Sequence, residues 1–68
     1  MTPDVLRETL ARLGISHTGA ARLLGVDART MRRWLAGSTD VPEIASRLLG
    51  LLVRDPSAID ALQSMTGD

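Results

Sequence analysis

The chain of 68 residues has no cysteine, tyrosine or phenylalanine, and it has one tryptophan and one histidine. Without cysteine it can form neither a disulfide nor a thiolate metal site, and its single histidine leaves mostly carboxylates as metal ligands, which zinc rarely uses. No apolar run approaches the roughly 20 residues that span a bilayer, and the polar start does not resemble a signal peptide. We expect a cytoplasmic protein without membrane, metal, cofactor or small-molecule ligand.

The shortage of aromatic residues also limits the core. With 44% hydrophobic residues, the chain can build one small core, mainly from leucine, valine, isoleucine, methionine and alanine. This composition favours helices over strands. The length allows one domain, residues 1–68, and is too short for two.

Lysine is absent as well, so that all eight basic residues are arginine, and the formal net charge is zero. The charges are unevenly placed: residues 1–37 hold six arginines and three acids, whereas residues 38–68 hold two arginines and five acids. Zero net charge counts against nucleic-acid binding, but the basic half can present a local positive surface. Arginine is also the better residue for bidentate contacts with phosphate or guanine.

Capping residues and glycines divide the chain into five predicted helices. An N-capping residue precedes each helix, and glycine ends the first three. The predicted helices lie between Thr2 and Gly14, between Ser16–Thr18 and Gly25, between Asp27 and Gly37, between Asp40 and Arg54, and between Asp55 and about Met65. The predicted fold class is all-α, a compact five-helix domain.

Residues 17–36 carry the most specific pattern, two helices joined by a short turn. Ala21 is small where the second helix approaches most closely, and Gly25 suits the positive φ expected in the turn. The remaining apolar positions that close the pair over the core are Ala20, Leu24, Val26, Met31 and Trp34. In this position Trp34 is expected in the core, rather than as a stacking platform for single-stranded nucleic acid.

These seven positions resemble the helix-turn-helix of the Cro and lambda-repressor-like (XRE-type) family of DNA-binding proteins. The later Gly37 and Pro42 also look like the family's usual continuation. The resemblance implies a five-helix fold, in which the helix after Asp27 enters the major groove and the start of the preceding helix contacts phosphate. A packing corner without a ligand is the plainer alternative.

The helix after Asp27 carries its arginines on the side opposite Met31 and Trp34, at about 100° per residue. The outward residues are Arg29, Arg32, Arg33 and Ala36. A solvated charged face is the alternative, but such faces usually mix signs, and this one carries no acid.

We therefore expect four residues to read bases. Arg29 and Arg33, one turn apart, would contact guanine O6 and N7, Arg32 would contact a base or a phosphate, and Ala28 could touch a thymine methyl group. The expected phosphate contacts are His17 and Thr18, as the resemblance implies, and the hydroxyls and backbone N–H groups of the loop from Gly37 through Ser38 to Thr39. His17 fits a surface or capping role equally well.

The stretch from Leu48 to Val53 is apolar around much of its circumference. We expect part of it to form an interface between two copies, because a two-fold dimer can read two half-sites about 34 Å apart. The expected interface residues are Leu49, Leu52, Val53, Ile59 and Leu62. The alternative is that all these residues belong to the core.

The sequence thus predicts a transcriptional regulator, a repressor or autoregulator, that binds a palindromic operator in double-stranded DNA as a homodimer. A chain of this length has no room for a sensing domain, so its own concentration would set its occupancy. Such a protein suits a phage-type Cro-like repressor, an anti-CRISPR-associated autoregulator or the DNA-binding half of an antitoxin. The alternative is a protein-interaction module, antitoxin-like or an adaptor, that uses the surface from Leu48 to Val53. No residue set suggests an enzyme.

Overall fold

The first three helices begin with the same kind of side-chain cap. The computed structural model describes residues 1–66, and these helices are α1 (Pro3–Leu13), α2 (His17–Leu24) and α3 (Ala28–Ala36). Thr2 Oγ1 accepts from the Val5 N–H at 3.2 Å, Ser16 Oγ from the Gly19 N–H at 2.9 Å, and Asp27 Oδ1 from the Thr30 N–H at 2.7 Å. The starts predicted at Thr2 and Asp27 are confirmed, and of the residues considered for α2 it is Ser16 that caps.

The same three helices end at glycines with left-handed backbone conformation. At Gly25 φ is +74°, and φ is also positive at Gly14 and Gly37. This conformation costs residues other than glycine free energy. In each case the glycine and the residue after it donate their N–H groups to carbonyls of the last turn, as in a Schellman motif. Each helix therefore stops where the sequence predicts.

The fourth helix starts later than expected. α4 (Glu43–Arg54) has Pro42 at its N-cap position and no side-chain capping bond, so the prediction that Asp40 caps it is wrong. Pro42 disfavours helical conformation at Val41 and is itself extended, with ψ of 146°, so the helix cannot begin nearer to Asp40. α5 (Ser57–Thr66) follows a short turn, in which the Ser57 hydroxyl donates to Asp55 Oδ1 at 2.5 Å.

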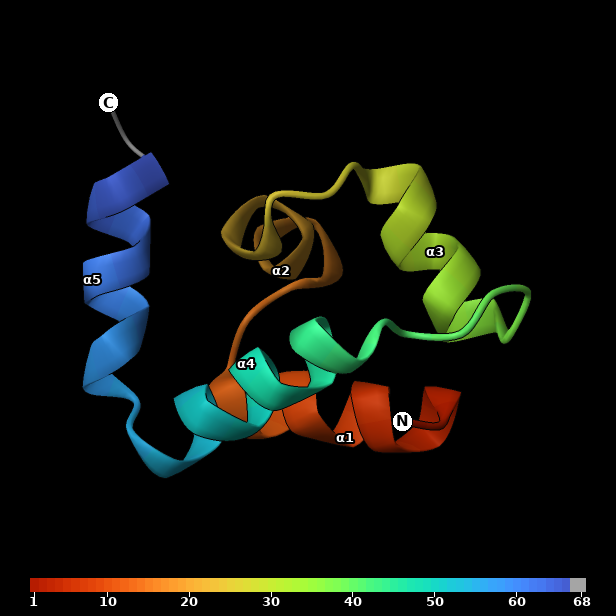
Figure 1. The fold of residues 1–68 in the computed structure, drawn as a ribbon, viewed down its shortest axis with the longest axis horizontal. Coiled ribbons are helices and arrows are strands. Elements are labelled where there is room, and N and C mark those ends of the chain that lie inside the picture. Colours follow the sequence, from red (N-terminus) through yellow and green to blue (C-terminus); the bar gives the residue numbers. More distant parts are fainter. Residues whose placement is uncertain (67–68) are drawn as a thin grey trace.

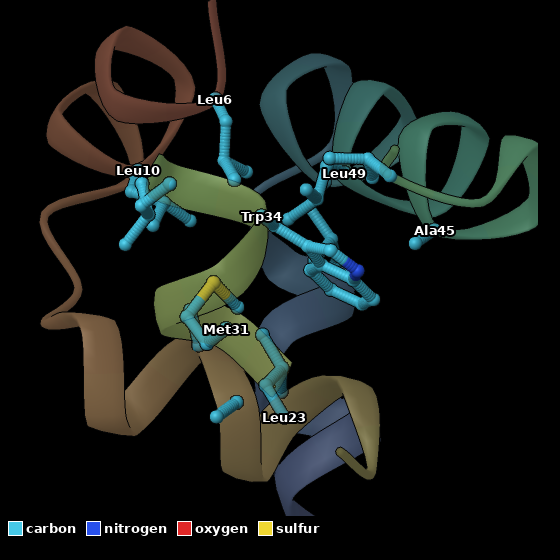
Figure 2. Packing of buried hydrophobic residues seen from close by; sticks show 12 residues of the cluster. Leu6, Leu10, Leu23, Met31, Trp34, Ala45 and Leu49 are labelled. Atoms are coloured by element: carbon cyan, nitrogen blue, oxygen red, sulfur yellow. The ribbon is translucent and has the colours of Figure 1, made fainter. Parts of the chain in front are cut away.

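The described residues form one helical assembly around a shared core. α1 packs against α3 and α4, α2 packs against α3, and α5 lies beside α2 and the end of α4 (Figure 1). Figure 2 shows Met31 and Trp34 pointing from α3 into this core, and both are buried, as predicted. The largest fully buried side chains are Leu6, Leu10, Met31, Leu49 and Leu52.

Two leucines of α4 that were expected in the interface between two copies lie in the core instead. Leu49 and Leu52 are 0% exposed in a single chain, so they cannot form a surface for a second copy. Val53, Ile59 and Leu62 are half-buried, and Ile59 and Leu62 pack against the same core. The physical reason is size, because a small domain with one aromatic residue needs these side chains to complete its own core.

The alternative function, a protein-interaction module, depends on an exposed surface from Leu48 to Val53. Most of that stretch is buried or half-buried in the folded chain. Within that stretch Leu48 and Val53 are half-buried, and only Gly50 and Leu51 are exposed.

Candidate nucleic-acid interface

Three arginines lie together on the exposed side of α3. Within residues 1–66 the guanidinium groups of Arg29, Arg32 and Arg33 form no hydrogen bond or ion pair with the protein. Three other arginines are paired: Arg7 with Asp4 at 3.4 Å, Arg12 with Glu8 at 3.7 Å and Arg47 with Glu43 at 2.8 Å. The cations of α3 therefore keep their donors available to a ligand.

The opposite side of α3 is fixed in the core. Met31 and Trp34 point inward, and Leu35, which the sequence analysis did not single out, is also buried. Ala36 is exposed together with the three arginines, whereas Ala28 is half-buried at the start of the helix. The outward direction deduced from helical spacing is therefore the exposed side of α3 in the structure.

Asp27 is the acidic residue that the arginines of α3 affect. Hydrogen bonds that the side chain and the backbone N–H of Thr30 donate to the Asp27 carboxylate lower its pKa, and the positive charges of Arg29 and Arg33 lower it further. A capping carboxylate is held at the helix N-terminus, so it offsets only part of the positive potential. The face made by Arg29, Arg32 and Arg33, called the arginine face below, remains cationic.

Both ends of α3 are anchored, which fixes the direction of the arginine face. At its start Asp27 caps the helix, and the adjoining turn is closed by the Val26 N–H, which donates to the Ala21 carbonyl at 2.9 Å. At its end the Arg7 guanidinium donates from Nη2 to the Leu35 carbonyl at 2.9 Å. Sequence reasoning missed the role of Arg7, because its partner is a backbone carbonyl 28 residues away.

The exposed side of α2 carries further polar residues. His17 and Thr18 are exposed in its first turn, and since Ser16 supplies the cap, Thr18 takes no part in it. Arg22 lies one turn after Thr18 on the same side and, within the part of the chain that the structure describes, has no ion pair. Sequence reasoning overlooked Arg22, although its i+4 spacing from Thr18 was the available signal.

The loop after α3 has fewer free backbone N–H groups than the sequence suggests. The Gly37 N–H donates to the Trp34 carbonyl at 3.2 Å, and the Ser38 N–H donates to the Arg33 carbonyl at 3.0 Å. The expectation that these backbone groups are available to a phosphate is therefore wrong, since the helix end uses them. The side chains of Ser38 and Thr39 are exposed.

A hollow of about 280 Å³ lies elsewhere, between α1 and α4. It is lined by Met1, Val5, Glu8, Thr9, Arg12, Gly50 and Val53. None of the predicted site residues except Val53 borders it. Among residues 1–66 there is no group of three potential metal ligands, and no helix there has the length and apolarity needed to cross a membrane.

Comparisons with known proteins give no relative from which a function could be transferred. No family model matches the chain, and neither does a curated protein or a solved structure. The interpretation of the arginine face therefore depends on the residues of this chain.

Proposed function

We propose that the chain is a sequence-specific DNA-binding transcriptional regulator, a repressor or autoregulator, that reads the major groove with the arginine face of α3. The observation that supports this best is a helix anchored at both ends whose exposed side presents three arginines without ion-pair partners in the described chain. In this proposal α2, the turn at Gly25 and α3 form a helix-turn-helix like that of the Cro and lambda-repressor-like family.

The proposed base contacts follow from the chemistry of the guanidinium group. Arg29 and Arg33 each offer two parallel N–H donors, which match guanine O6 and N7, and each bidentate pair gives about 1–3 kcal/mol of discrimination. Their separation of four residues corresponds to a rise of about 6 Å along the helix, close to two base-pair steps. Arg32 contacts a neighbouring base or phosphate, and Ala28 is small enough for close approach to a thymine methyl group.

Phosphate contacts would hold α3 in register without reading sequence. The exposed side of α2 supplies His17, Thr18 and Arg22, and the loop after α3 supplies the hydroxyls of Ser38 and Thr39. The Thr18 hydroxyl and the positive N-terminal end of α2 would contact the same phosphate. Of these residues Arg22 gives the strongest electrostatic contact.

Two copies on one operator compensate for the limited charge of one copy. The chain has a formal net charge of zero, so its attraction to DNA must come from this one surface. A two-fold dimer doubles the phosphate contacts and reads two half-sites about 34 Å apart, which requires a palindromic operator.

Selection of bound duplexes from a random pool tests the proposal. We expect enrichment of a palindromic sequence with guanine in each half-site. The variant that combines Arg29→Ala and Arg33→Ala is selected in parallel, and it should enrich no such sequence. Failure of the natural chain to enrich any sequence above the starting pool would contradict the proposed function.

A further inference from the structure

The outward side of α4 exposes two large apolar side chains. Ile44 is 76% exposed and Leu51 is 54% exposed. They stand seven residues apart, so they lie on the same side of the helix, about 10.5 Å apart along its axis. Leu48, half-buried, lies between them. An apolar stripe of this kind on a small domain marks a surface that another molecule can cover.

Two opposite charges stand beyond the two ends of this stripe. Asp40 precedes α4, Arg54 ends it, and both are exposed. Within residues 1–66 the structure shows neither charge in an ion pair, whereas Arg47, near the middle of the stripe, is already neutralised by Glu43 at 2.8 Å. The outward side of α4 thus has an acid before the stripe and an arginine after it, and the exposed Asp55 beside Arg54 accepts a hydrogen bond from the Ser57 hydroxyl.

We propose that this face binds a second copy of the chain, with the two α4 helices antiparallel across a two-fold axis. Ile44 of each copy then lies against Leu51 of the other, and Arg54 of each copy lies against Asp40 of the other. In residue number the apolar pair centres between Arg47 and Leu48 and the charged pair on Arg47, although Asp40 lies before the helix, so one antiparallel register brings both kinds of contact together. The arrangement is isologous, as a two-fold dimer requires.

Charge complementarity selects this partner and this direction. A parallel pair would place Arg54 against Arg54 and Asp40 against Asp40, which costs free energy. The antiparallel pair replaces these repulsions with two reciprocal attractions, and it also sets the helix dipoles in opposite directions. A partner of one charge sign would match only one end of the face.

The pairing rests on the dimer in the proposed function but not on DNA binding, so it is tested without DNA. The probe is the protein itself in sedimentation equilibrium. The natural chain should dimerise reversibly at high micromolar concentration. Arg54→Glu and Asp40→Arg should each weaken the dimer about tenfold or more, since both reciprocal contacts become repulsive. An equimolar mixture of the two variants should recover a dimer, because opposite charges then meet in both contacts.

Apolar variants supply the matched control. Met65 of α5 is as exposed as Ile44 but lies outside the stripe. Ile44→Glu should abolish the dimer, Met65→Glu should leave it unchanged, and far-UV circular dichroism should show both variants folded. The proposal is overturned by a natural chain that stays monomeric, by a mixture no more dimeric than its separate variants, or by a dimer that survives Ile44→Glu. Loss of DNA binding with an intact dimer would instead contradict the proposed function alone.

Discussion

Arg7 of α1 holds the last turn of α3 through a hydrogen bond from its Nη2 to the carbonyl oxygen of Leu35, 2.9 Å away. Carbonyl groups in the last turn of a helix have no partner within the helix, and a cation there also opposes the negative end of the helix dipole. This contact joins the first helix to the end of the helix that carries the arginine face.

Arg7→Ala should therefore destabilise the fold by about 1 kcal/mol, because a carbonyl at the end of α3 loses its charged donor while the solvent partly replaces it. Urea unfolding measures the change. Arg12→Ala is the matched control: Arg12 is also on α1, but it pairs only with Glu8, at 3.7 Å on the surface, so its loss should cost less than about 0.5 kcal/mol. Equal effects of the two substitutions would show that the bond to Leu35 contributes nothing particular.

Trp34→Ala should unfold much of the population. The indole is buried in the core, and its removal costs about 3–5 kcal/mol, a large fraction of the stability of a small domain. The loss should appear as a lower melting temperature in circular dichroism. Arg32→Ala, an exposed change on the same helix, should leave the melting temperature nearly unaltered. A Trp34→Ala variant that melts like the natural chain but no longer binds DNA would show that the indole contacts nucleic acid instead.

Asp27 should make the stability of the fold depend on acid pH. Its pKa is lowered from 3.8 in the folded chain, first by its hydrogen bonds with Thr30, so the folded state favours the ionised carboxylate. The stabilisation is present above the ordinary pKa of 3.8 and is lost as the pH falls through the lowered value.

Asp27→Asn separates the cap from the charge. Asparagine keeps a capping oxygen but does not ionise, so the melting temperature of this variant should fall less than that of the natural chain between neutral and strongly acidic pH. Asp27→Ala, which has no capping oxygen, should be the least stable of the three at neutral pH. An identical fall for the natural chain and Asp27→Asn would contradict the assigned role of the carboxylate.

Arg22 should act on DNA affinity without acting on sequence preference. A phosphate contact releases counterions, so Arg22→Ala should weaken binding to all duplexes alike and reduce the slope of log affinity against log salt by about 1 per bound copy. Fluorescence anisotropy over a salt series measures both effects. An unchanged slope would remove Arg22 from the interface.

The sequence predicts most of the helix boundaries, because caps and terminal glycines act within a few residues. Thr2, Asp27, Gly14, Gly25 and Gly37 all lie where the sequence analysis places them at helix ends. The outward position of the arginines follows as well, since helical spacing alone separates them from Met31 and Trp34.

Features that depend on tertiary packing escape such reasoning. The contact of Arg7 with Leu35 joins segments far apart in sequence, and the burial of Leu49 and Leu52 depends on how the helices around α4 cover it. The occupied Ser38 N–H could have been foreseen, because a Schellman motif after Gly37 uses that group. These differences change which residues can form the dimer interface and which groups can donate to a phosphate. The arginine face lies where it was predicted.

The most direct test of the central claim measures the affinity of Arg29→Ala and Arg33→Ala for the duplex that selection yields. Each variant should keep the melting temperature of the natural chain and lose about 1–3 kcal/mol of discrimination against a duplex with its guanines replaced. Arg12→Ala, which removes a paired arginine outside the face, should bind like the natural chain. Unchanged affinity and preference in both Arg29→Ala and Arg33→Ala would contradict DNA recognition by α3.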